Sequence, residues 1–160
     1  KVFLGDLNLS MIKSGMKNKY LNNKNVKWIN MNSEALPFKN NSFDKYIISF
    51  CLRNVTNIQK TLEESFRVLK DGGEFFCMEF SKVNQNSLNN IYNIYKNNLI
   101  PLIGKLVTKK MGAYNYLAES IDTFPNQDLL QKSLTKIGYF NVTYYNLFGG
   151  IVSIHKGWKI

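Results

Sequence analysis

The residues best suited to catalysis or ligand binding in this sequence stand where apolar runs end. In "YIISFCLRNVTN", the guanidinium of Arg53 and the amide of Asn54 directly follow a run of apolar side chains. A charge at the end of a buried run needs a ligand or an ion-pair partner, because an unpaired charge is costly to bury. Ser49 lies within the same run, and the ends of two other apolar runs carry Asp6 and the pair Asn32 and Ser33.

Each of these other residues has two alternative roles, one in ligand binding and one in the local structure. Asp6, at the start of an expected helix, can accept both hydroxyls of a ribose, or it can simply complement the helix dipole. The amide of Asn32, next to Ser33, can pair with an adenine edge, or both residues can form a turn. Ser49 can bond a polar group of a ligand or serve only the structure of its strand.

The elements that would position these residues alternate between strands and helices. Apolar patterns predict strands over 1–6, 26–31, 44–50, 74–80, 140–147 and 150–158, and helices over 8–21, 56–73, 87–107, 113–121 and 126–138. Such alternation predicts an α/β fold with a parallel sheet and right-handed crossovers, closed by an antiparallel hairpin around "FGG". Ligands of such sheets bind beyond the carboxyl ends of the strands, where the residues named above lie.

Local signals define several ends of these elements. Asn8 fits a helix N-cap, and Thr56-x-x-Gln59 fits a capping box. "KDGG" places glycine where the C-cap of the same helix needs it, and Gly138 ends the last helix. The third strand is apolar on both faces, which predicts burial on both sides.

Composition limits the class of protein and the kinds of site. The 160 residues suffice for one domain with a sizeable core, and 44% hydrophobic content indicates a globular chain. The net charge is +10, but all but two of the 21 basic residues are scattered lysines, which argues against specific nucleic-acid binding. Cys51, Cys77 and the single histidine form no ligand motif, so we predict no metal site. No apolar segment approaches the about 20 residues of a membrane-spanning helix.

Five segments carry a resemblance to a known family. They are "GDLNLSMIKSG", "NSEALPFKNNSFDKYIISFCLRNVTN", "RVLKDGGEFFCMEFSK", "YNYLAESIDTFPNQDLL" and "LFGGIVSIHKGW". The chain resembles the class I S-adenosylmethionine-dependent methyltransferases, and within them the ubiquinone/menaquinone biosynthesis C-methyltransferases. "ALPF" and "LKDGG" are common to many methyltransferases, whereas "LRNVTN", "EFSK", "YLAESIDTFP" and "GGIVSIHKGW" are narrower. The resemblance extends over residues 2–159 and implies a Rossmann-like sheet.

The resemblance implies S-adenosyl-L-methionine as cofactor and a polyprenyl quinol as substrate. Enzymes of this family move a methyl group from the cofactor sulfonium to a ring carbon of a polyprenyl benzoquinol (2-polyprenyl-6-methoxy-1,4-benzoquinol type) or of demethylmenaquinol. By the same resemblance, Asp6 binds the cofactor ribose, Asn32 and Ser33 lie at the adenine, and Ser49 lies near the methionine part.

Arg53 and Asn54 face the substrate in this resemblance, and Arg53 is the candidate for helping to deprotonate the quinol hydroxyl through water. A ring carbon ortho to a phenolate is nucleophilic, so the site needs a base or a cation that stabilises the oxyanion. Because arginine almost never loses its proton, we predict the second role. Two alternatives stay open: Arg53 can form a structural ion pair with Glu79, and His155 can be either a base or a structural residue.

The chain departs from the family pattern at its start and at Cys51, where glycine is usual. The family fold begins with a strand and a Gly-rich loop that holds the carboxypropyl end of the cofactor, and the sequence shows neither. That strand belongs between the first and third strands here, so we expect unpaired backbone groups and an open core at that place. The prediction is a single, N-terminally truncated domain over 1–160, with a cofactor-side half over about 1–82, a substrate-side half over about 83–160 and poor cofactor binding by itself. The Cys51 side chain either narrows the site or fills space.

Partners and location rest on the resemblance and on the apolar region 89–107. With nearby lysines, that region predicts a substrate lid touching an anionic membrane surface, or else a core or dimer helix. The bias to Asn and Lys indicates an AT-rich eukaryotic source, which by resemblance implies the matrix side of the mitochondrial inner membrane; otherwise the cytoplasm is expected. A homodimer or a quinone-biosynthesis complex is a further expectation. The alternatives to this enzyme are a non-catalytic, methyltransferase-like subunit of such an assembly and a methyltransferase for another lipid or small molecule.

Overall fold

Strands and helices alternate along the computed structural model, which describes residues 1–19, 21, 24–82 and 111–160. The strands are β1 (Val2–Asp6), β2 (Val26–Asn30), β3 (Phe43–Ser49), β4 (Leu69–Phe80), β5 (Phe140–Leu147) and β6 (Val152–Trp158). The helices are α1 (Leu9–Met16), α2 (Ile58–Val68), α5 (Met111–Thr123) and α6 (Gln127–Ile137), with short 3-10 turns η1 (Leu52–Asn54) and η4 (Phe148–Gly150). The predicted α/β fold is confirmed; the helix predicted over 87–107 lies outside the described residues.

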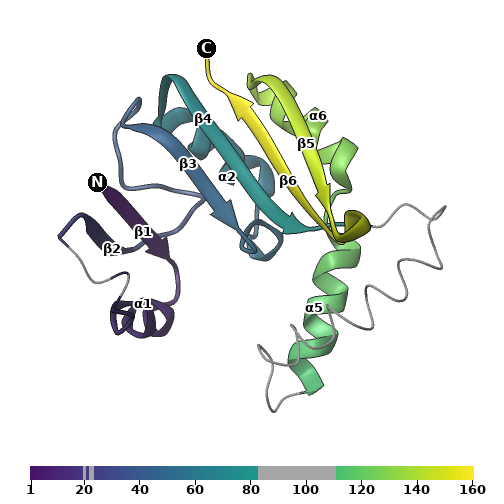
Figure 1. The fold of residues 1–160 in the computed structure, drawn as a ribbon, viewed down its shortest axis with the longest axis horizontal. Helices are drawn as coiled ribbons and strands as arrows, with labels where there is room; N and C mark the ends of the chain where they lie inside the picture. Colours follow the sequence, from purple (N-terminus) through teal and green to yellow (C-terminus); the bar gives the residue numbers. More distant parts are fainter. Residues whose placement is uncertain (20, 22–23, 83–110) are drawn as a thin grey trace.

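The strands form two sheets rather than one. β1 and β2 form a parallel pair in which Asp6 lies opposite Asn30. The other sheet has the order β3-β4-β6-β5, with β3 and β4 parallel and β6 antiparallel to both of its neighbours, which confirms the predicted hairpin. Within the described residues no strand joins β1 to β3 (Figure 1). The break therefore falls where the missing family strand was expected.

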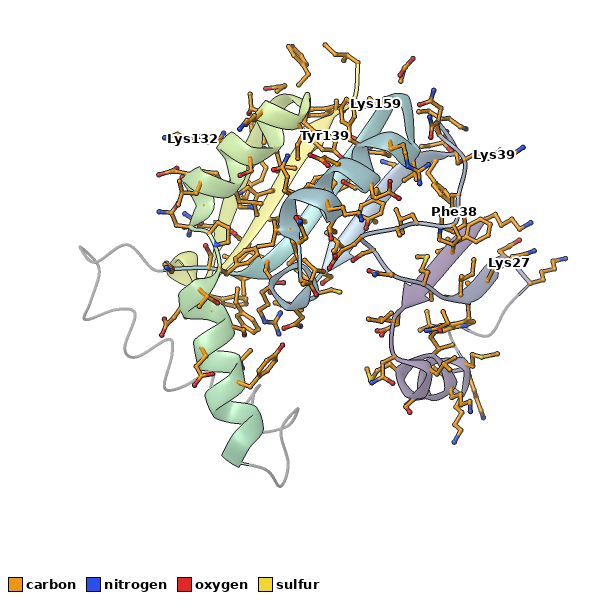
Figure 2. The ribbon with its side chains drawn as sticks, turned by 180° about the vertical axis from the view of Figure 1, so that it is seen from behind. Lys27, Phe38, Lys39, Lys132, Tyr139 and Lys159 are labelled. Atoms are coloured by element: carbon orange, nitrogen blue, oxygen red, sulfur yellow. The ribbon has the colours of Figure 1, made fainter. Side chains whose placement is uncertain are left out.

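A cluster of three phenylalanines bridges this break. Phe3 on β1 lies 5.5 Å from Phe38 and 5.6 Å from Phe43 on β3, measured between ring centres. Phe38 and Phe43 are 4.8 Å apart, and all three pairs meet edge to face, an arrangement that aromatic rings favour. Phe38 lies beside β1 in the view from behind (Figure 2). Side chains thus hold together two sheets that share no backbone ladder.

The main core lies between the four-stranded sheet and the helices α2 and α6 (Figure 1). Its fully buried members include Leu52, Leu62, Leu69, Phe75, Leu130 and Leu134. Tyr139, labelled in Figure 2, packs 5.0 Å from both Phe66 and Phe75, and its hydroxyl lies 2.8 Å from Ser65 Oγ. Burial of each such side chain is worth about 1.5–3 kcal/mol, so this layer fixes the position of β4 and its carboxyl end.

Two helix ends follow the local signals in the sequence. Asn8 caps α1, and its Oδ1 accepts the Ser10 N–H at 2.8 Å. Gly138 ends α6 with φ 119°, a left-handed conformation that glycine adopts without strain. Both predictions are confirmed, because each depends only on residues within one turn of the cap.

The predicted capping box at Thr56 is wrong. Asn57 caps α2 instead, and its Oδ1 accepts the Lys60 N–H at 3.0 Å. A carboxylate distant in sequence explains the shift: Glu34 Oε1 accepts the N–H groups of Thr56 at 2.7 Å and Asn57 at 3.1 Å. This contact fixes where the chain enters the helix and leaves the cap to Asn57.

The "KDGG" segment does not cap α2, as was predicted. The helix ends at Val68, and β4 begins at once with Leu69 opposite Phe43 on β3. The segment forms an irregularity within β4, where Gly72 takes φ 78° and donates its N–H to the Lys159 carbonyl at 2.7 Å. The glycine therefore serves a bulge in a strand rather than a helix end.

Burial of the third strand on both faces is also wrong for the described part of the chain. On the α2 side of β3, Ile48 is buried and Tyr46 stacks on Phe75 at 5.9 Å. On the other side, Ile47 is 69% exposed. The reason is that α2 and α6 cover only one face of this sheet, and no described element covers Ile47.

The two predicted halves share one sheet, because β4 lies before residue 83 and pairs with β6 after it. The assignment of a cofactor side and a substrate side to these halves stays a prediction. None of the helices described is long and apolar enough to cross a membrane.

Candidate active site

The carboxyl ends of parallel strands gather the candidate residues at one edge. Asp6 is the last residue of β1 and Ser49 the last of β3, while Glu79 stands one residue before the end of β4. The arrowheads of β1, β3 and β4 point the same way (Figure 1). The structure therefore presents these residues along the edge where α/β proteins bind ligands.

Asp6 is exposed and holds the turn that starts α1. Its Oδ1 accepts the Asn8 N–H at 2.7 Å, and no described residue bonds its other carboxylate oxygen. The Asp6 carbonyl accepts the Met31 N–H at 3.1 Å and the Asn30 side-chain amide at 2.9 Å, which ties the ends of β1 and β2 together. The helix-start role predicted as one alternative is present, and one carboxylate oxygen is left for a ligand.

Asn32 and Ser33 form a tight turn after β2. Asn32 Oδ1 accepts the Glu34 N–H at 2.9 Å, and Ser33 Oγ lies 3.5 Å from Thr61 Oγ1 on α2. These are the turn contacts predicted from the sequence. The Asn32 NH2 group has no partner among the described residues and remains able to donate to a ligand.

The chain turns sharply after Ser49, which is exposed. Phe50 has φ 51°, a strained conformation for a bulky side chain, and its N–H donates to the Met78 carbonyl at 2.9 Å. The next residue, Cys51, has its thiol pKa raised by burial and further by the charges of Asp6 and Glu79.

Arg53 and Glu79 form a buried ion pair at the centre of this edge. Arg53 Nη1 donates to Glu79 Oε1 at 2.6 Å, and the Arg53 main-chain N–H donates to Oε2 at 3.3 Å. The arginine side chain is 10% exposed and the glutamate 0%. The guanidinium carbon also lies 5.2 Å from the centre of the Phe80 ring. The alternative of an ion pair with Glu79 is therefore confirmed; whether Arg53 also acts on a substrate stays a prediction.

Asn54 connects this edge to α5. Its Oδ1 accepts the hydroxyl hydrogen of Tyr116 at 3.1 Å, and the Tyr116 side chain is 57% exposed. Sequence reasoning missed Tyr116, although it stands within the narrow "YLAESIDTFP" segment. Its neighbour in space, Asn54, is distant in sequence, so only the placement of α5 reveals the contact.

His155 is buried away from solvent on β6 and has a structural contact. Its Nε2 lies 2.9 Å from the Gln127 carbonyl oxygen, which only accepts, so this nitrogen carries a proton. Burial lowers the pKa of the imidazole, and Nδ1 is buried without a described partner. These contacts favour the structural alternative. Elsewhere in the described chain, no three His, Cys, Asp or Glu side chains are grouped as a metal ion would need.

Comparison with known proteins gives a consistent family. The model of the ubiE/COQ5 methyltransferase family matches residues 1–159. Proteins named ubiquinone/menaquinone biosynthesis C-methyltransferase UbiE, from Cronobacter sakazakii and Zymomonas mobilis, are 47% and 41% identical to the chain over 99% of its length. The chain spans 64% and 66% of the length of these relatives, just under two thirds.

Solved structures show the same fold at lower identity. A SAM-dependent methyltransferase from Aquifex aeolicus superposes with a TM-score of 0.68 at 17% identity, covering 100% of this chain and 69% of its own. The CMeT domain of the citrinin polyketide synthase gives 0.67 at 16% identity, covering 98% of this chain and 38% of the other. The likeness identifies the class I methyltransferase fold and, at these identities, nothing about the substrate.

Proposed function

The chain belongs to the ubiE/COQ5 methyltransferase family, and on that premise we propose that the whole protein methylates a ring carbon of a polyprenyl quinol, with S-adenosyl-L-methionine as methyl donor. The substrate is a benzoquinol of the 2-polyprenyl-6-methoxy-1,4-benzoquinol type or demethylmenaquinol, and the names of the two relatives support this class. The structural observation that carries the proposal is the Arg53 guanidinium, held at the carboxyl edge of the sheet.

The described residues suit the nucleoside end of this cofactor. Asp6 offers a free carboxylate oxygen to a ribose hydroxyl, and Asn32 offers its NH2 group to an adenine nitrogen. Ser33 and Ser49 border the same edge. No Gly-rich turn from a strand into a helix occurs in the described residues, so the fit does not extend to the carboxypropyl end.

In this proposal the chain's own task is to make the ring carbon nucleophilic. The bound cofactor supplies an electrophilic methyl group. Arg53 donates a hydrogen bond to the developing phenolate and lowers the phenol pKa, while the proton leaves through water because arginine does not accept it. Asn54, held by Tyr116, orients the substrate beside Arg53.

Replacement of Arg53 tests the proposal. Full-length protein would be assayed for methyl transfer to a short-chain methoxy benzoquinol. Arg53→Ala should lower the rate about 10²–10³-fold, the usual effect of removing an oxyanion donor. An unchanged rate would reject the assignment.

Arg67 provides the matched control, because it is the other arginine of the chain. It pairs with Glu64 at 2.6 Å on α2 and donates to the carbonyls of Leu36 and Phe38. Arg67→Ala should lower stability but leave the rate per folded molecule unchanged, which separates a loss of chemistry from a loss of structure.

A second candidate function is that of a non-catalytic subunit of a quinone-biosynthesis assembly. Binding of S-adenosyl-L-methionine to the full-length protein distinguishes the two candidates, since a subunit without catalysis needs none. A methyltransferase for another lipid or small molecule would bind the cofactor and reject both quinols.

Location and assembly are also proposals. A peripheral contact with a membrane, a homodimer and a quinone-biosynthesis complex are consistent with a lipid-tailed substrate. The lysines expected to touch the membrane, Lys96, Lys105, Lys109 and Lys110, lie outside the described residues. The matrix face of the mitochondrial inner membrane applies to a eukaryotic source and the cytoplasm to a bacterial one; both relatives named above are bacterial.

A further inference from the structure

Glu79 is a buried acid whose carboxylate is bonded by Arg53 and by the main chain of Phe80. Oε1 accepts both Arg53 Nη1 at 2.6 Å and the Phe80 N–H at 2.9 Å, and Oε2 accepts the Arg53 main-chain N–H at 3.3 Å. The glutamate is 0% exposed, and burial raises its pKa while Arg53 opposes that shift. Its position is set by β4, a strand paired on both sides. The Glu79 carboxylate is therefore fixed in place and holds the Arg53 side chain.

The Arg53 guanidinium has contacts through one nitrogen and one face, while its other two nitrogens have no partner among the described residues. Nη1 is bonded to Glu79, and the Phe80 ring lies 5.2 Å from the guanidinium carbon. Nη2 has no partner among the described residues, and Nε is buried without one. A buried donor without a partner is costly, and such groups occur where function requires them. A buried ion pair is in itself a weak source of stability.

We propose that Glu79 is a positioning residue for the methyl-transfer site, which holds the Arg53 guanidinium with Nη2 toward the substrate oxygen and cancels its charge. This inference rests on the proposed function. In this arrangement Arg53 meets the oxyanion as an oriented hydrogen-bond donor within a neutral pair. Loss of the Glu79 charge would leave a full cation beside the phenol and make that phenol more acidic.

Other titratable groups near the pair do not replace Glu79. They are the Cys51 thiol in the turn after β3, the Cys77 thiol on β4, the Asp6 carboxylate on β1 and the Tyr116 phenol on α5. Burial raises the pKa of both thiols, which keeps them neutral near pH 7. Of these groups only Asp6 carries a carboxyl group, and the described hydrogen bond of its side chain goes to the turn that starts α1.

The test compares Glu79→Gln and Glu79→Asp with wild type in the full-length protein. The rate of methyl transfer to a short-chain methoxy benzoquinol would be followed against pH. In the proposed reaction the rate rises with pH as the bound phenol ionises. Glu79→Gln should lower the plateau rate about tenfold or more and move the rise about one pH unit lower, because the cation is no longer neutralised. Glu79→Asp keeps the charge and should lower the plateau without moving the rise.

Glu64→Gln is the matched control, since Glu64 also pairs with an arginine. It lies near the end of α2, which leads back to the start of β4 at the opposite edge of the sheet. Its rate and pH profile should equal those of wild type. Urea unfolding of each variant gives the folded fraction, and a purely structural role for Glu79 would change that fraction without moving the pH profile.

A double-mutant cycle with Arg53→Met isolates the action through Arg53. In that background, Glu79→Gln should change the remaining rate less than about twofold and leave the pH profile in place. The double variant also keeps no unpaired buried charge, so it provides a folded reference. If Glu79→Gln alone does not fold, Glu79→Asp carries the test through its lowered plateau.

Three results would overturn the inference: a wild-type plateau in Glu79→Asp, an unmoved pH profile in folded Glu79→Gln, or an equal loss of rate with and without Arg53. Absence of methyl transfer by wild type would instead reject the proposed function. The two failures are therefore distinguishable.

Discussion

The ion pair of Arg53 with Glu79 does not exclude the role at the substrate that we propose for this arginine. The guanidinium pairs with Glu79 through Nη1 at 2.6 Å, and its other two nitrogens, Nε and Nη2, have no partner among the described residues. A side chain with five donors can satisfy a structural acceptor and a ligand at once, which a lysine in this place could not do with the same geometry. An ion pair at this position is therefore compatible with contact to a substrate.

The Arg53–Glu79 contact could be anticipated from sequence, whereas the Asn54–Tyr116 contact could not. Arg53 follows β3 and Glu79 lies one residue before the end of β4, two neighbouring strands that the apolar runs identify, and parallel strands end at one edge. Tyr116 depends on how α5 crosses that edge, and no pattern in its own segment specifies the crossing. The turn roles of Asn32 and Asp6 were predictable because their bonds reach only two residues along the chain.

Residue-scale electrostatics also predict a pH dependence of stability. Burial lowers the pKa of His155, so below its ordinary value of about 6.5 the unfolded chain binds a proton that the folded chain does not. The free energy of unfolding should therefore fall as the pH drops from about 7 to about 5, by up to about 1.4 kcal/mol per pH unit from this group.

His155→Gln keeps a donor for the Gln127 carbonyl and removes the titration. Urea unfolding at several pH values gives the free energy of unfolding of wild type and of the variant. As the pH falls, the free energy of unfolding of wild type should fall relative to that of His155→Gln. Acids with depressed pKa values, such as Glu64 and Glu74, act at lower pH and equally in both proteins. A difference that does not change with pH would contradict the prediction.

At the scale of elements, local sequence signals predicted a helix end correctly where the capping residue bonds only within its own helix. Asn8 and Gly138 were predicted from their own turns. The start of α2 was not, because Glu34 bonds the two N–H groups that precede the helix. The prediction that "KDGG" caps the helix is wrong for a similar reason: Leu69 is already paired with Phe43, so the glycines lie within a strand.

The start of α2 gives a direct test of this reading. Asn57→Ala should lower the free energy of unfolding by about 1 kcal/mol, because Lys60 N–H loses its acceptor. Thr56→Ala should change it by less than about 0.5 kcal/mol, since the Thr56 contact to Glu34 uses the main chain. Thermal or urea unfolding measures both changes. A larger loss of unfolding free energy for Thr56→Ala than for Asn57→Ala would support the capping box at Thr56.

At the scale of the whole molecule, the main feature is the break between β1 and β3, which divides the predicted site residues between two sheets. The four-stranded sheet ends at β3, where Ile47 is 69% exposed. Asp6 and Asn32 lie on one side of the break, and Ser49 and Arg53 lie on the other. The place of this break was predicted from the family resemblance, in which a strand that the sequence does not show belongs between the first and third strands; the apolar runs alone identify only the strands that are present.

A protein consisting of residues 1–160 alone should bind S-adenosyl-L-methionine at least about tenfold more weakly than the Cronobacter sakazakii relative. The reason is that the residues predicted to bind the cofactor are divided between two sheets, and each tenfold loss of affinity needs only about 1.4 kcal/mol. Titration calorimetry on both proteins measures the ratio, with circular dichroism to confirm that each is folded. Equal affinities would show that the break does not weaken the site.

The phenylalanine bridge has a consequence for the order in which the molecule opens. The β1–α1–β2 unit is continuous in sequence and is joined to β3 by Phe3, Phe38 and Phe43 rather than by a backbone ladder. Such a unit can open while the larger sheet stays closed, so its amide hydrogens exchange with solvent first. A ligand that contacts Asp6 and Ser49 together spans both units, and its binding energy adds to the closure of the smaller one. For this part of the chain, ligand capture and local folding are then a single equilibrium.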